Sequence, residues 1–144
     1  MATDTGSDSF LANRVDRAAL PLAVGDLLVI VAFIYAGTLQ HGTVPFPLTG
    51  ADDVLALLAV AAPFLVGWVL AAPVVGAYSA GAVESAKASV PLAIRSWIPA
   101  AVIGLIIRAT PVVDGGVAVS FAIVMLIVGS VSLGVWRYVA GQFL

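Results

Sequence analysis

Few residues in this chain of 144 could do chemistry. It contains one histidine and no cysteine, which leaves no thiolate nucleophile and no multi-histidine or thiolate metal site. Eight acidic residues outnumber six basic ones, so the net charge of −2 gives no polybasic surface for nucleic acid. We find no paired carboxylates and no Ser-His-Asp pattern. The sequence therefore predicts no enzyme: no catalytic residue, no bound metal and no cofactor.

Asp26 is the most informative residue because it interrupts a long apolar stretch. Burying an aspartate in a bilayer costs about 2.5–3.5 kcal/mol, and its side chain is too short to reach the membrane surface. It must therefore be paired, protonated or in contact with water. Arg95 and Arg137 are expected to enter from the same side at a similar depth, so either could pair with Asp26. The alternative interpretation is a proton, cation or substrate site centred on these three residues.

A second group of polar residues, His41 and Arg108, is expected on the other side of the membrane. A histidine at a helix end and an outward-reaching arginine are the simpler interpretation, and a polar path along the first span is the alternative. Trp68, Trp97 and Trp136 are expected on the Asp26 side, together with Tyr78 and Tyr138. They would form either an aromatic belt at the lipid headgroups or the wall of a pocket.

The elements that must position these residues are four apolar stretches. Hydrophobic residues make up 62% of the chain and charged residues 10%, too few charges for a water-facing surface. A membrane-spanning helix needs about 20 apolar residues, and residues 18–40, 54–75, 90–110 and 116–139 meet that length. The sequence predicts an all-α, integral membrane four-helix bundle over 18–140, with a polar tail at 1–17 and a short C-terminal tail at 141–144.

The distribution of basic residues predicts the orientation of the bundle. Four spans place the termini and the middle loop on one side, with five basic residues: Arg14, Arg17, Lys87, Arg95 and Arg137. Only Arg108 lies on the other side, so both termini are expected in the cytoplasm and the protein in the plasma membrane as a multi-pass chain. Asp52 and Asp53 offer an N-cap for the second span. Gly67 and Ala71 form a small-residue pair for close helix packing, within the bundle or in a dimer.

Several of these residues form a recognisable pattern. It comprises Gly25-Asp26, Gly37, His41, the segment Pro63–Trp68, Arg95, Trp97, Arg108, Phe121-Ala122 and Trp136-Arg137. The chain resembles, over about residues 18–140, a family of small four-span membrane proteins of halophilic archaea and actinobacteria that is catalogued as a domain of unknown function. The resemblance implies four spans and no established activity.

Two functions from different classes remain open at this point. The first is a structural or accessory subunit of a membrane assembly, in which Asp26 is buried and paired. The second is a small ion, proton or solute transport or channel-type protein, in which water reaches Asp26. Four helices enclose little volume, so transport would favour an oligomer. A membrane enzyme acting on a lipid or quinone has the least support. The expected partners are the lipid bilayer and either a second copy or other membrane subunits.

Overall fold

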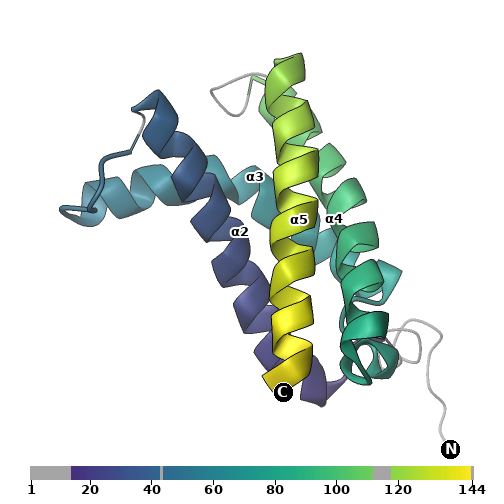
Figure 1. Cartoon of the computed structure of the whole chain (residues 1–144). Helices are drawn as coiled ribbons and strands as arrows, with labels where there is room; N and C mark the ends of the chain where they lie inside the picture. Colours follow the sequence, from purple (N-terminus) through teal and green to yellow (C-terminus); the bar gives the residue numbers. More distant parts are fainter. Residues whose placement is uncertain (1–13, 43, 112–117, 144) are drawn as a thin grey trace, which may run out of the picture.

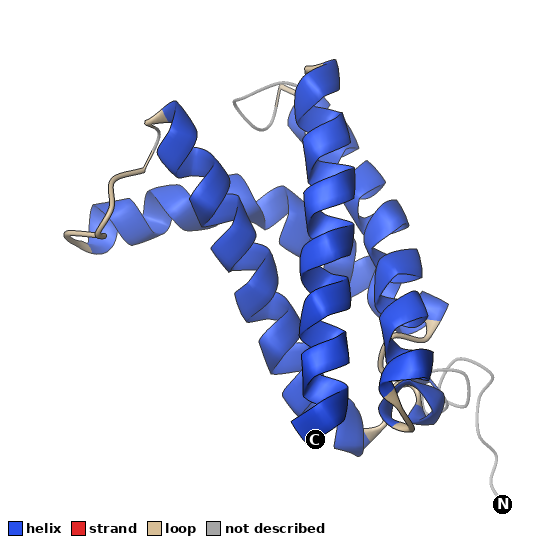
Figure 2. Ribbon diagram, in the orientation of Figure 1, coloured by secondary structure: helices blue, strands red, loops and turns tan. Residues whose placement is uncertain are grey.

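The structure is a computed structural model that describes residues 14–42, 44–111 and 118–143. The long helices are α2 (Leu20–His41), α3 (Ala51–Val75), α4 (Ala86–Ala109) and α5 (Val119–Phe143). Two short 3₁₀ helices, η1 (Arg17–Ala19) and η2 (Ala80–Val83), precede α2 and α4 (Figure 2). Each long helix is apolar and long enough to cross a membrane. Over these described ranges, the prediction of an all-α fold with four candidate spans is confirmed.

The helix bounds differ from the predicted spans because polar residues begin or extend the helices. α3 starts three residues earlier, with Gly50 as its N-cap. The prediction that an aspartate caps this helix is wrong: Asp52 and Asp53 lie in its first turn, and the Asp53 carboxylate accepts a hydrogen bond from the Thr49 backbone N–H at 2.8 Å. Acidic residues in a first turn still favour the helix through its dipole.

The last two helices also differ from the prediction. α4 starts four residues earlier, because the Ser85 side chain caps it by accepting a hydrogen bond from the Ala88 N–H. α5 continues to Phe143, so residues 141–143 belong to the helix rather than to a C-terminal tail. Residues 116–117 of the predicted fourth span lie outside the described residues.

α2 and α5 run in opposite directions, which brings the start of α2 and the end of α5 to the same end of the bundle, and α3 crosses behind them at a steep angle (Figure 1). The α3–α4 connection lies at that end too, since its residues bond to α5 and to the segment before α2. At the other end, α2 splays away from α5, and the start of α3 lies far from α4 and α5 (Figure 1). The elements at the end where α2 starts and α5 ends therefore determine how α2 is attached to the rest of the bundle.

The end of the predicted N-terminal tail is part of the folded structure. The Asp16 side chain caps η1 by accepting from the Ala18 N–H at 2.8 Å. The Asp16 backbone N–H donates to the Tyr78 carbonyl at 2.7 Å, which joins this segment to the α3–α4 connection. Residues 1–13 of the predicted tail lie outside the described residues.

Glycine sets the closest helix approach in the bundle. A Cβ atom on Gly67 in α3 would overlap the backbone carbonyl of Ala100 in α4. A Cβ on Gly104 in α4 would overlap the ring of Phe64 in α3. Membrane helices gain association energy from such close packing, so α3 and α4 form the tightest pair. The small-residue prediction at Gly67 thus finds a contact inside the bundle.

Candidate functional site

Asp26 lies in α2 with no exposed surface, and its two carboxylate oxygens accept four hydrogen bonds. Arg137 of α5 donates from Nε to Oδ1 at 2.9 Å and from Nη2 to Oδ2 at 2.6 Å, a bidentate ion pair. Trp136 donates its indole N–H to Oδ1 at 2.9 Å, and the Tyr78 hydroxyl donates to Oδ2 at 2.8 Å. We call Asp26, Tyr78, Trp136 and Arg137 the clamp. It joins the first long helix to the last.

Arg137 is also fully buried, and other groups accept its remaining hydrogen bonds. Nη1 donates to the Ala77 carbonyl at 3.1 Å and to the Ser89 hydroxyl oxygen at 2.8 Å. The guanidinium lies over the Tyr78 ring, 5.5 Å from its centroid. Arg137 therefore connects α5 to α2, to the α3–α4 connection and to the first turn of α4. A buried ion pair repays its desolvation cost only when further hydrogen bonds satisfy the remaining donors and acceptors, and these contacts supply them.

Gly25 allows Trp136 of the clamp to pack against α2. Gly25 precedes Asp26 on α2, and a Cβ at this position would overlap the Trp136 indole ring. The indole therefore packs directly against the α2 backbone, where its N–H reaches Asp26. The Gly25-Asp26 and Trp136-Arg137 pairs of the sequence pattern form this one contact.

Tyr78 connects the clamp to the bundle interior. Its hydroxyl accepts a hydrogen bond from the Trp68 indole N–H at 2.6 Å while it donates to Asp26. Burial is the main cause that raises the pKa of the Tyr78 phenol above its usual value, and the nearby negative charge of Asp26 and its hydrogen bond raise that pKa further. The phenol is therefore held neutral, as a donor to Asp26 must be.

Tyr78→Phe tests this connection. The loss of the hydroxyl leaves the Trp68 N–H without its acceptor and Asp26 without one donor, which should lower the free energy of unfolding by about 1–3 kcal/mol. Because the folded-state pKa is raised, the contribution of Tyr78 is complete below the unfolded pKa of about 10 and decreases as pH rises above it. Unfolding in detergent should show that alkaline decrease for the parent chain. An equal decrease in Tyr78→Phe would contradict the assignment.

The tryptophans occupy the interior as well as the clamp. Trp68 and Trp97 are 1% and 0% exposed, so neither contributes to an aromatic belt on the outer surface. Their indole N–H groups are satisfied inside the bundle, by Tyr78 and by the Met125 carbonyl, and therefore do not need the membrane interface. Trp136 is partly buried in the clamp. Of the aromatic residues expected at the interface, Tyr138 is exposed.

Successive ring contacts run through the interior of the bundle. Tyr78 contacts Trp68, Trp68 contacts Trp97, and Trp97 contacts Phe64, with centroid separations of 6.2–6.4 Å. Phe64 then contacts Phe121 at 6.1 Å. The guanidinium of Arg108 lies 4.7 Å from the Phe121 centroid. The rings thus connect the clamp with Arg108 near the other end of the bundle.

The structure does not bring all the predicted site residues together. Arg137 contacts Asp26, whereas Arg95 is exposed on the outside of α4, and no ion pair between Arg95 and Asp26 is present in the described part of the chain. The depth predicted for Arg95 would allow it to pair with Asp26. Its side chain, however, is exposed on the outer side of α4 and therefore does not contact Asp26. Arg108 packs on Phe121, and His41 is the last residue of α2, with a side chain outside the described residues.

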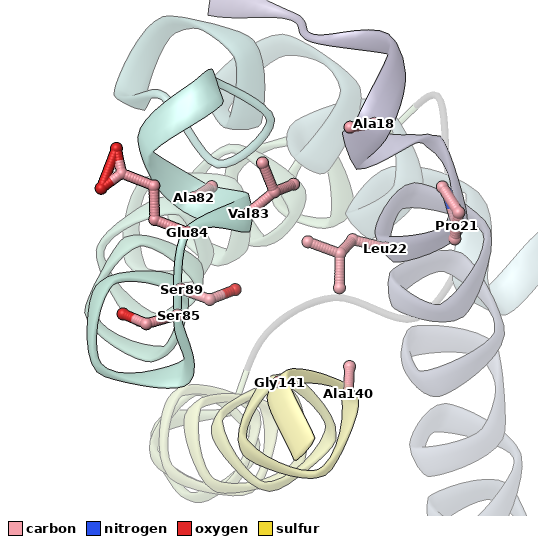
Figure 3. Close-up of a pocket in the computed structure, with 10 residues that line it drawn as sticks. All are labelled: Ala18, Pro21, Leu22, Ala82, Val83, Glu84, Ser85, Ser89, Ala140 and Gly141. Atoms are coloured by element: carbon pink, nitrogen blue, oxygen red, sulfur yellow. The ribbon is translucent and has the colours of Figure 1, made fainter. Parts of the chain in front are cut away.

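We call the end of the bundle where α2 starts and α5 ends the clamp end. A small pocket of about 110 Å³ lies at this end (Figure 3). Its wall comes from η1, α2, η2, α4 and α5, and the Ser89 hydroxyl points into it while the Glu84 carboxylate points away (Figure 3). Ser89 also accepts the hydrogen bond from Arg137. The pocket therefore lies next to the clamp, with Ser89 between the pocket and Arg137. No group of three or more metal-ligating side chains occurs in the ranges that the structure describes.

Sequence reasoning missed Ser89, and it placed Tyr78 among the aromatic residues of a belt or pocket wall rather than as a partner of Asp26. Both lie outside the apolar stretches that we predicted, Tyr78 in the connection and Ser89 just before the predicted third span. The one available signal was chemical: a buried carboxylate needs several donors, and the polar residues of the middle loop lie on its side of the membrane.

Comparison with known proteins gives a family and no activity. No curated protein and no solved structure matches the chain. Residues 23–140 match a family described as "Protein of unknown function (DUF3054)", and that range contains all four clamp residues. With four helices able to cross a membrane and a family match over most of its length, the chain is a multi-pass membrane protein that belongs to the DUF3054 family.

Proposed function

We propose that this protein is a non-catalytic structural or accessory subunit of a membrane assembly. One observation carries the proposal: Asp26 and Arg137 are both completely buried, and they satisfy each other with two charge-assisted hydrogen bonds. A carboxylate that served as a transport site would need a free oxygen for a proton, cation or solute. Both oxygens of Asp26 are already occupied, by four donors from three side chains.

The orientation and location extend this proposal. We infer that the clamp end faces the cytoplasm and that the membrane is the plasma membrane. The support is the positive-inside tendency, because Arg14, Arg17 and Lys87 all belong to the clamp end of the chain, together with Arg137.

The pocket beside Ser89 favours a second candidate, a transport or channel-type protein that works as an oligomer. A space of about 110 Å³ holds a few water molecules. Ser89 lies between this space and Arg137, so solvent could approach the clamp from the bundle end. In that case Asp26 would leave Arg137 during a transport cycle, and the pocket would be the entrance.

Asp26→Asn distinguishes the two functions. A structural subunit should lose stability and release the membrane proteins that accompany it, because an asparagine cannot neutralise Arg137. In a transport protein, the fraction of the variant that remains folded should keep its partners while it loses proton or ion flux in liposomes. The measurements are mild-detergent purification from native membranes with mass spectrometry, and a pH-sensitive dye inside proteoliposomes. Glu84→Gln is the matched control, since this exposed carboxylate lies at the same end of the bundle and points away from the pocket.

Two results would overturn the structural proposal. One is proton or ion flux that depends on Asp26 in a variant that is otherwise folded. The other is native purification that yields the chain with no other membrane protein, in the parent and in both variants.

A further inference from the structure

The charged residues inside the long helices differ in how they are satisfied. Three lie more than a turn and a half from either end of a described helix: Asp26, Arg95 and Arg137. Asp26 and Arg137 neutralise each other. Arg95 is exposed on α4, and no hydrogen bond, ion pair or ring contact joins it to any other residue within 14–42, 44–111 and 118–143. An arginine on the lipid-facing side of a span is costly without a counter-charge, and none of the described residues supplies one.

The depth of Arg95 indicates where that partner lies. α4 has 24 residues and is therefore about 36 Å long, a little more than the hydrocarbon thickness of about 30 Å. Arg95 is nine residues after Ala86, so its Cα lies about 10 Å inside the hydrocarbon when the helix is centred. Side chains on a helix lean toward its N-terminus. The long stem of Arg95 thus directs the guanidinium back toward the headgroups at the start of α4.

A second cation lies on the same side of α4 at that end. Lys87, Pro91 and Arg95 are spaced four residues apart, and all three are exposed. Lys87 is in the first turn, at the level of the headgroups, and it has no partner among the described residues. Lys87 from the surface and Arg95 from below therefore face the same headgroup layer, with the compact proline between them.

We propose that Lys87 and Arg95 form a binding site for the phosphate of an anionic phospholipid in the leaflet at the clamp end. The phosphate supplies the counter-charge that residues 14–42, 44–111 and 118–143 do not provide, and guanidinium groups bind phosphate oxygens through charge-assisted hydrogen bonds. Each basic residue near an anionic membrane surface strengthens binding about fivefold. The apolar face beyond Arg95, with Ile98 and Val102 exposed, would contact the acyl chain of the same lipid. This site is independent of whether the protein is a subunit or a transporter.

The test is retention of lipid by the full-length chain. The protein is placed in nanodiscs of equimolar phosphatidylcholine and phosphatidylglycerol, released into detergent, and weighed by native mass spectrometry. The parent chain should retain phosphatidylglycerol in preference to phosphatidylcholine. Arg95→Gln and Lys87→Gln should each lower that preference about fivefold, while Arg95→Lys should retain most of it. Excess inorganic phosphate in the buffer should not displace the lipid, because free phosphate has no acyl chain to bind α4.

Arg17→Gln is the matched control, because Arg17 is an exposed cation at the same end of the bundle but not on α4. It should leave the lipid preference close to that of the parent. The proposal is overturned if the Lys87→Gln/Arg95→Gln double variant, still folded by circular dichroism, keeps the parent preference, or if Arg17→Gln loses as much. It is also overturned if Arg95→Gln releases a co-purified membrane protein and leaves the lipid preference unchanged. Arg95 would then pair with a carboxylate of that partner.

Discussion

Replacing Arg137 with glutamine should lower the free energy of unfolding by about 3–5 kcal/mol, because it leaves the Asp26 carboxylate buried without its counter-charge. Glutamine also cannot reproduce the contacts of Nη1 with Ala77 and Ser89, which connect α5 to the α3–α4 connection and to α4. The measurement is titration of the folded chain from a mild detergent into sodium dodecyl sulfate. Tryptophan fluorescence reports the transition, since Trp68 and Trp97 are buried only in the folded bundle.

The double variant Asp26→Asn/Arg137→Gln provides the control for this prediction. It removes both charges together, so no buried charge remains unpaired, and its loss of stability should be clearly smaller than the sum of the two single losses. Losses that simply add would show that the two side chains act independently, contrary to their bidentate contact.

Gly67→Ala should separate α3 from α4 and lower the free energy of unfolding by about 1–3 kcal/mol. The added methyl would overlap the Ala100 carbonyl, which belongs to a helix backbone and cannot turn away as a side chain can. Gly104 and Phe64 lie in the same interface, so a shift of the two helices would disturb that contact as well. The same detergent titration measures the loss.

Gly37→Ala is the matched control for the glycine prediction. Gly37 is exposed on α2, and a Cβ there would have no atom within 4 Å. Alanine favours a helix more than glycine does, so this variant should unfold at the same point as the parent or later. Equal destabilisation by both substitutions would show that the loss of stability in Gly67→Ala does not come from overlap with the Ala100 carbonyl.

The four helices were predictable because the length and polarity of a membrane span are properties of the sequence alone. The pairing of Asp26 was predictable only as far as its side and its depth. Both Arg95 and Arg137 met these criteria, and the structure shows that only Arg137 contacts Asp26. The direction in which a residue points around its helix depends on how the helices pack, and spans that are apolar on every side carry no stripe that would reveal it.

The tryptophans show the same limit in another way. Trp68 and Trp97 each lie in the half of the predicted span that is nearer the Asp26 side of the membrane. An amphipathic ring toward the end of a span commonly contacts headgroups. Their burial depends on acceptors from distant parts of the chain, the hydroxyl of Tyr78 and the carbonyl of Met125. The matching glycine, Gly129, leaves the space that the Trp97 indole fills. No local pattern in the sequence records such a pairing.

The distance along the chain between Asp26 and Arg137 has a consequence for synthesis of the protein. The two partners are 111 residues apart, and a ribosome adds about 5–20 residues each second. The carboxylate therefore leaves the ribosome roughly ten seconds before the arginine that neutralises it. Until α5 is inserted, the Asp26 side chain must be protonated, remain in contact with water or stay inside the insertion machinery. The ion pair can thus form only after α5 has been synthesised, and a chain truncated before Arg137 would leave an unpaired acid in the membrane, a feature that quality-control proteases could recognise.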